Sequence, residues 1–140
     1  MEIDTDVVRL RLDRILETIN RIEPIVRDGI EDYRGNFMKQ AALERYLQVA
    51  AQAVIDIATH IVAVRHLGAP TSYADAVISL GREHIIDGSL TARLANLVNV
   101  RNILVHMYLQ VDQDVIFESA REAVRDLREF VDEISKMLSS

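Results

Sequence analysis

The sequence contains no cysteine, and it is poor in proline, glycine and aromatic residues. Without cysteine there is no disulfide framework, no thiolate metal site and no cysteine nucleophile. The two prolines and five glycines fall well below the roughly 12% that these residues usually make up, and aromatic residues account for 5% of the chain. A turn-rich β-sandwich, a collagen-like chain and a disulfide scaffold are therefore excluded. A disordered chain is excluded as well, because 49% of the residues are hydrophobic.

The sequence also lacks long apolar runs and an excess of positive charge. No stretch approaches the roughly 18 uninterrupted apolar residues that mark a membrane span, and the acidic segment 1–6 does not resemble the start of a signal peptide. We therefore expect a soluble, cytoplasmic protein without membrane contact. The formal net charge of −6 disfavours non-specific nucleic-acid binding, which depends on phosphate neutralisation. Charge is nevertheless distributed unevenly, since the stretch from Ser89 to Gln110 contains Arg93 and Arg101 but no acidic residue.

Apolar positions recur at helical spacing almost throughout the chain. The pattern predicts a helix that begins after Asp4 or Asp6 and that Pro24 kinks or ends, a long helix over about 36–67, a short helix from Ser72 to Gly81, a helix over about 90–108, and a last helix that begins near Asp112 or Asp114. No repeat or linker divides the 140 residues. The prediction is one all-α domain over residues 1–140, a bundle of about four long helices plus a short one.

The predicted helix over 90–108 carries the polar residues of greatest interest. Its apolar residues cover most of its sides, which is typical of a helix buried in a core or in a subunit interface. Arg101 lies within the apolar stripe, and Asn99, Asn102 and His106 form a narrow polar strip beside it. A buried charge needs a partner or a purpose. Arg101 therefore either pairs with a carboxylate of another helix or belongs to a functional site.

The segment from Arg101 to Tyr108 reads R-N-x-L-V-H-x-Y, and in this form it resembles the HepT family of HEPN-domain ribonuclease toxins. The resemblance extends over about residues 44–130. The other segments that carry it are Glu44–Leu47, Ala53–His60, Gly68–Tyr73 and Val111–Asp112. Met107 stands where the family often has Glu, and His84 stands where Gly is common. Neither departure replaces Arg101 or His106.

The resemblance implies a HEPN-type bundle that forms a two-fold dimer and acts as an endoribonuclease. Metal-independent RNA cleavage needs a base for the 2′-hydroxyl proton and a cation for the charged phosphorane, and these roles fit His106 and Arg101. Histidine exchanges protons near neutral pH, and arginine grips phosphate bidentately. Asn102 would position the phosphate or the ring of His106. Because the reaction uses the 2′-hydroxyl, RNA and not DNA would be the substrate.

The spacing of the motif favours a site built from two copies of the chain. Arg101 and His106 are five positions apart, which on a helix is a rotation of about 140° and a rise of about 7.5 Å. They do not lie one above the other, and a cleft shared across a two-fold axis would bring them together. No cofactor is expected. A metal site is also not expected, because none of the four histidines follows the Glu-x-x-His pattern of di-iron bundles.

Two further residues have competing interpretations. Tyr108 either packs in the core or, as the resemblance implies, accepts AMP from a nucleotidyltransferase antitoxin of the MntA type. Asp56 and His60 are four positions apart on one helix. The pair is either a satisfied polar contact in the bundle, or Asp56 points at the cleft and orients His106 or pairs with Arg101.

The ribonuclease hypothesis has one serious rival, a non-catalytic HEPN scaffold that pairs with a nucleotidyltransferase. The simultaneous presence of Arg101, Asn102, His106 and Tyr108 argues against the scaffold, which has no need for a buried Arg and His. A DNA-binding regulator would need a recognition helix with exposed basic residues, and the acidic balance of the chain argues against it.

Overall fold

A computed structural model describes residues 2–106 and 110–140, and within these ranges the chain is helical without strands. The helices are α1 (Thr5–Arg27), α2 (Ile30–Arg34), α3 (Phe37–Val64), α4 (Tyr73–Arg82), α5 (Gly88–Val105) and α6 (Gln113–Ser139). The prediction of an all-α bundle is confirmed. The five-residue α2 was not predicted, because a helix of that length is too short to show a periodic apolar pattern.

Polar side chains at the starts of the helices explain where most of them begin. The side chains of Asp4, Asn36, Ser72, Asp87 and Asp112 each accept a hydrogen bond from a backbone N–H in the first turn of the helix that follows. These bonds satisfy donors that have no partner within the helix. The predicted caps Asp4, Ser72 and Asp112 are confirmed, whereas α5 begins two residues earlier than expected, directly after Asp87.

Pro24 does not end the first helix, so that part of the prediction is wrong. α1 continues to Arg27, and the backbone N–H of Asp28 donates to the carbonyl of Pro24 at 3.1 Å. Proline lacks the N–H that would bond to the preceding turn, which weakens the helix at that point. Ile22 and Ile25, on either side of Pro24, are both buried in the core, and this packing keeps the last turn of α1 in place.

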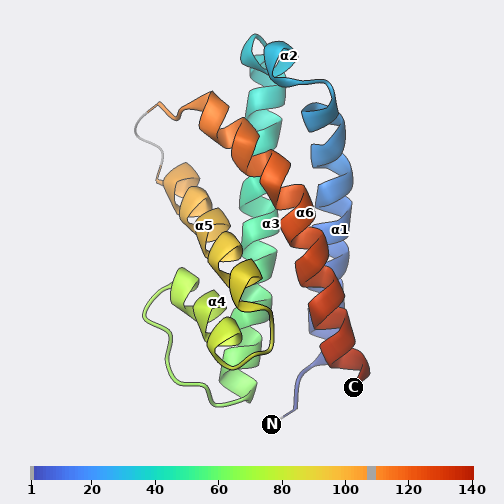
Figure 1. Cartoon of the computed structure of the whole chain (residues 1–140), viewed down its shortest axis with the longest axis vertical. Helices are drawn as coiled ribbons and strands as arrows, with labels where there is room; N and C mark the ends of the chain where they lie inside the picture. Colours follow the sequence, from blue (N-terminus) through green and yellow to red (C-terminus); the bar gives the residue numbers. More distant parts are fainter. Residues whose placement is uncertain (1, 107–109) are drawn as a thin grey trace.

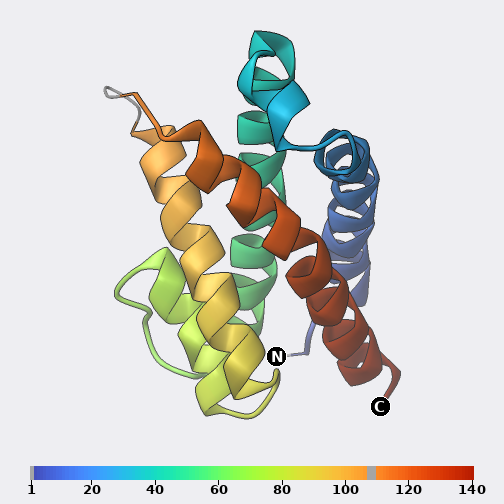
Figure 2. The same ribbon diagram turned by 45° about the horizontal axis from the view of Figure 1, so that its top comes forward.

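The helix α3 occupies the centre of the bundle, with α1 on one side and α4 and α5 on the other (Figure 1). α6 crosses obliquely over α3 from the tip where α5 ends to the end of the bundle that carries both termini (Figure 2). By length and composition α3 passes for a membrane-spanning helix, but 61% of its most apolar window is buried inside the bundle. Its apolar character is therefore that of a core helix.

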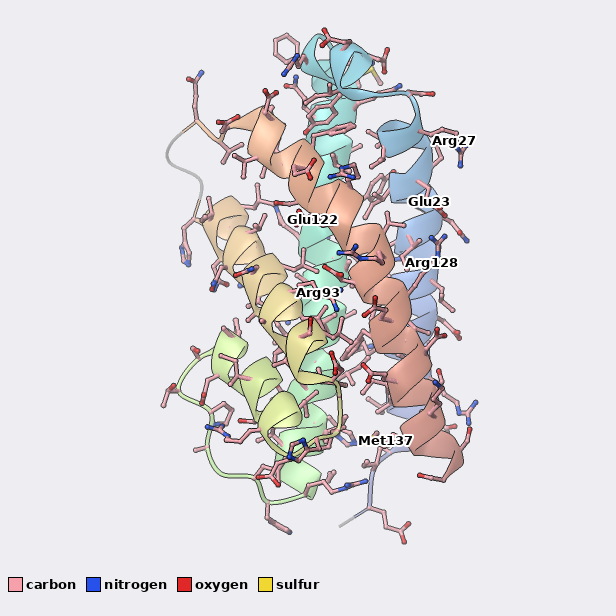
Figure 3. All side chains as sticks on the ribbon, in the orientation of Figure 1. Glu23, Arg27, Arg93, Glu122, Arg128 and Met137 are labelled. Carbon is pink, nitrogen blue, oxygen red and sulfur yellow. The ribbon has the colours of Figure 1, made fainter. Side chains whose placement is uncertain are left out.

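Polar contacts fix α6 against its neighbours along its length. Arg128 of α6 contacts Glu23 of α1 at 2.5 Å, and Figure 3 shows the two residues on facing helices. Near the start of α6, Arg34 of α2 lies 2.7 Å from Asp114, and this contact lowers the pKa of the Asp114 carboxyl. The fully buried Tyr33 donates its hydroxyl hydrogen to Gln113, and burial raises the pKa of that hydroxyl. The short α2 is thereby anchored to α6.

Gly81 is required where α4 crosses α5. A Cβ atom at this position would lie 2.3 Å from Thr91 Oγ1 and 2.8 Å from Thr91 Cβ. Thr91 is buried, and its hydroxyl donates to the Asp87 carbonyl at 2.8 Å, so it has little freedom to move away. We expect Gly81→Ala to destabilise the fold by about 2 kcal/mol, because overpacking outweighs the roughly 1 kcal/mol by which alanine favours a helix.

Urea unfolding measures this effect, with Gly35→Ala as the matched control. A Cβ atom at Gly35 meets nothing within 4 Å, so we expect the control to stay within about 0.5 kcal/mol of the parent. Equal stability of Gly81→Ala and the parent chain would mean that α4 and α5 separate without cost, which contradicts the close contact seen here.

Candidate active site

The helix α5 ends sooner than the sequence predicted, and His106 is the residue that directly follows it. The helix was expected to reach Tyr108 but ends at Val105. His106 is the C-cap residue, with φ −97° and ψ 35°, and its backbone N–H donates to the Asn102 carbonyl at 3.2 Å. Its side chain is exposed. Tyr108 lies outside the described residues.

Three of the motif residues meet in one cleft of about 540 Å³. Arg101, Asn102 and His106 form the α5 side of this cleft, which we call the motif cleft. The remaining lining residues come from α3, α4 and the loop between them: Thr59, Pro70, Thr71, Ser72, Tyr73 and Ala76. Arg101 and His106 thus line the same cleft within a single chain, although they are five positions apart in the sequence.

Arg101 is held by neutral groups rather than by a carboxylate. Its Nη2 donates to Gln52 Oε1 at 2.9 Å and its Nη1 donates to Asn102 Oδ1 at 3.1 Å. Among the described residues no carboxylate oxygen lies within 4.0 Å of its guanidinium group. The interpretation of Arg101 as half of a structural ion pair is therefore wrong. An arginine fixed by amide oxygens keeps its positive charge available for an anionic ligand.

Asp56 reaches Arg101 only through Gln52. The Nε2 of Gln52 donates to Asp56 Oδ1 at 2.8 Å, and Arg11 Nε contacts Asp56 Oδ2 at 3.1 Å. Within the described part of the chain no hydrogen bond joins Asp56 directly to Arg101 or to His106, and none joins it to His60. His60 instead accepts a hydrogen bond from the backbone N–H of Asp4 at 2.9 Å, which ties the N-terminal segment to α3.

Arg101 also lines a second cavity. This cavity of about 630 Å³ lies between α1 and α3, and we call it the α1–α3 groove. Its walls carry both charges, including Arg11, Arg45 and Asp56. Arg101 thus lines both the motif cleft and the α1–α3 groove, and its partner Gln52 lines the groove.

A third, mostly apolar cavity lies beside His106 where α5 ends and α6 begins. It is lined by Val100, Ile103, His106, Gln110, Val111, Asp112, Val115 and Ile116. Two of its apolar side chains are strongly exposed, Ile103 by 60% and Val115 by 54%. No group of three or more His, Asp or Glu side chains placed to hold a metal ion occurs in residues 2–106 and 110–140.

Two residues of the site were not found from the sequence, namely Gln52 and Tyr73. Gln52 lies one turn before Asp56 on α3, and Tyr73 directly follows the N-cap Ser72. Tyr73 places its ring 5.2 Å from the Arg101 guanidinium carbon. Both reach Arg101 across long stretches of chain, and no local spacing pattern reports such contacts.

Comparison with known proteins identifies the family of the chain. Residues 15–134 match the family model described as Ribonuclease HepT-like. The chain belongs to the HepT-like ribonuclease family. It is 30% identical to the mRNA nuclease HepT of Shewanella oneidensis, over 92% of this chain and 96% of that protein. It is 29% identical to the tRNA nuclease HepT of Aphanizomenon flos-aquae, over 97% of this chain and 92% of that one. The predicted family and the prediction that the chain is a ribonuclease are confirmed.

Solved structures of HepT-like toxins share the fold. A toxin–antitoxin structure with AMP-PNP superposes with a TM-score of 0.86 at 29% identity, covering 94% of this chain and 98% of that one. A tri-AMPylated Shewanella oneidensis HEPN toxin, in complex with its MNT antitoxin, gives 0.85 at 30% identity with the same coverage. The HEPN-type architecture of this HepT-like ribonuclease is thereby confirmed.

Proposed function

We propose that this HepT-like ribonuclease is the toxin of a type VII-like toxin–antitoxin pair and cuts RNA internally without a metal ion, in the cytoplasm. The observation that carries the proposal is the convergence of Arg101, Asn102 and His106 on the motif cleft, with the charge of Arg101 left free of carboxylates. This combination offers a proton acceptor and a fixed cation at one place. These are the groups that 2′-hydroxyl attack on a phosphodiester requires.

The reaction that fits the cleft is an internal transesterification. His106 takes the proton from the 2′-hydroxyl, O2′ bonds to the adjacent phosphorus, and the bond from phosphorus to O5′ breaks. A protonated imidazole returns a proton to O5′, so the products carry a 2′,3′-cyclic phosphate and a 5′-hydroxyl. Arg101 stabilises the negative charge of the phosphorane. The Oδ1 of Asn102 is engaged by Arg101, so its Nδ2 is the atom that donates to a phosphate oxygen.

Two copies of the chain are proposed to pair around the motif. The exposed apolar side chains Ile103, Val105 and Val115 surround the end of α5, and apolar side chains of this size favour burial against a partner. A two-fold dimer through this region would place two motif clefts close together in one substrate-binding surface. Asp56, acting through Gln52, would hold Arg101 in position in each copy.

The toxin is proposed to be neutralised by an MntA-like nucleotidyltransferase antitoxin that transfers AMP to Tyr108. The support comes from the related toxins, one of which is tri-AMPylated and bound to an MNT antitoxin. A relative of this kind has also been crystallised as a tyrosine-to-alanine mutant of the MntA pair. Tyr108 follows His106 by two positions, so an adenylate there brings a phosphate next to the motif. That phosphate competes with RNA for Arg101.

Cleavage of total RNA by purified protein in excess EDTA tests the proposal, with His106→Ala in parallel. The protein is first checked by mass spectrometry for a tyrosine adduct, since adenylated protein would be inert. We expect chelator-resistant cutting that leaves 2′,3′-cyclic phosphate ends and that the variant lacks. Absence of cutting by unmodified protein, or equal cutting by His106→Ala, would leave the non-catalytic scaffold as the function.

A further inference from the structure

Tyr73 is an aromatic side chain on the wall of the motif cleft whose surface is half exposed. It is the first residue of α4, and 48% of its surface is accessible. The backbone on both sides is fixed: Ser72 Oγ accepts from the Asp75 N–H at 3.0 Å, and the Asp75 carboxylate accepts from the Thr71 N–H at 2.9 Å. The ring is therefore presented to the cleft from a rigid turn.

The position of this turn follows from the path of the chain. The loop after α3 runs back along the side of the bundle, so that α4 starts beside α5 (Figure 1). The Tyr73 ring consequently lies over the Arg101 guanidinium, with 5.2 Å between the ring centroid and Cζ. Despite this contact Tyr73 remains 48% exposed, and it lines the cleft that also holds His106.

The surroundings of the ring are chemically suited to a nucleotide. The hydroxyls of Thr59, Thr71 and Ser72 line the cleft, and none of the described residues that line it is acidic. The cleft therefore offers a flat aromatic surface, hydroxyl groups and one cation within a volume of about 540 Å³. Proteins that bind single-stranded RNA combine these elements, since bases stack on aromatic rings while cations hold the backbone.

We propose that Tyr73 is the stacking platform for the nucleobase next to the cleaved phosphate. The base lies on the exposed part of the Tyr73 ring while the phosphate contacts Arg101, so the motif cleft binds one nucleotide of an unpaired RNA strand. This inference rests on the proposed ribonuclease function and adds the residue that recognises the base. It also makes unpaired RNA the substrate, because a base within a helix cannot reach the ring.

Binding measurements in the His106→Ala background test the platform without interference from cleavage. The probes are an oligouridine that carries one 2-aminopurine and an abasic ribose-phosphate oligomer of the same length. We expect the protein to quench the 2-aminopurine fluorescence, as stacking does. Tyr73→Leu is expected to lose the quenching and to bind the base-containing probe about 5- to 150-fold more weakly. Its affinity for the abasic oligomer should not change.

Tyr73→Phe is the matched control, because it keeps the ring and removes the hydroxyl. It should retain both the quenching and the affinity, and both variants should unfold at the urea midpoint of the His106→Ala background. Equal weakening of both probes by Tyr73→Leu would mean that the ring only holds Arg101 in place, and this would overturn the proposal. If the parent chain cleaves RNA in EDTA but the His106→Ala protein does not quench the 2-aminopurine, the stacking proposal is overturned and the ribonuclease proposal stands. Quenching without cleavage would overturn the ribonuclease proposal and leave the platform standing.

Discussion

Replacement of Arg101 by alanine should lower kcat/KM for RNA cleavage by about 10²–10³-fold while the bundle stays folded. The guanidinium is the cation in the motif cleft and is held by Gln52 and Asn102. Its loss removes stabilisation that develops with the phosphorane charge, so kcat is expected to fall more than KM rises. Arg101→Lys should restore little activity, because an ammonium group cannot grip phosphate bidentately while contacting both amide oxygens.

Two further variants give this prediction its controls. Arg9→Ala removes an exposed arginine of α1 that does not line the motif cleft, and its activity should equal that of the parent chain. Gln52→Leu removes the acceptor 2.9 Å from Arg101 Nη2 without changing the charge, so its activity should lie between those of the parent and Arg101→Ala. Cleavage by Arg101→Ala at the parent rate would show that the phosphorane is stabilised elsewhere.

The second large effect concerns the attachment of α5 to α6. Asp126 of α6 is buried, and it is hydrogen-bonded to Arg93 of α5, which also contacts Glu129 at 3.1 Å. Arg93 lies on the side of α5 that faces α6 (Figure 3), and the two carboxylates raise the pKa of its guanidinium. Arg93→Ala leaves Asp126 in the interface with only Arg125, at 3.5 Å. We expect a loss of about 3 kcal/mol in the free energy of unfolding.

Urea unfolding of Arg93→Ala is best compared with that of Arg121→Ala. The latter breaks an exposed ion pair with Glu118 on the same helix α6, and such pairs contribute less than about 1 kcal/mol. The double variant Arg93→Ala and Asp126→Ala should lose less unfolding free energy than the two single variants lose together. The reason is that it removes the buried carboxylate along with its arginine partner. A stability of Arg93→Ala within the range of the Arg121→Ala control would refute the prediction.

Features of the fold that depend on contacts between residues close in the sequence are predictable from it, whereas those that depend on distant residues are not. Asp4, Ser72 and Asp112 mark helix starts through bonds to residues two or three positions away, so local patterns predict them. The end of α5 at Val105 has no comparable signal, since neither glycine nor proline follows it before Tyr108. The early end concerns the site directly, because His106 is the residue that caps α5 and lines the motif cleft with Arg101.

The neighbours of Arg101 show the opposite case. The sequence motif predicts that Arg101, Asn102 and His106 act together, and the structure places all three in one cleft. It does not predict Gln52 or Tyr73, which approach from α3 and α4 over 49 and 28 positions of chain. The apolar stripe around Arg101 is as compatible with a carboxylate partner as with an amide partner. Only the three-dimensional packing of α3 against α5 reveals that the partner is an amide.

Arg101 lines both the motif cleft and the α1–α3 groove, so we expect ligand binding in one cavity to affect ligand binding in the other. A phosphate that draws the guanidinium further into the motif cleft stretches its bond to Gln52, and Gln52 in turn is bonded to Asp56 in the groove. A compound that fills the groove and fixes Gln52 is therefore expected to change the affinity for RNA, and by thermodynamic reciprocity RNA would change the affinity for the compound to the same degree. We therefore expect a small molecule bound in the α1–α3 groove to alter RNA binding without occupying the motif cleft.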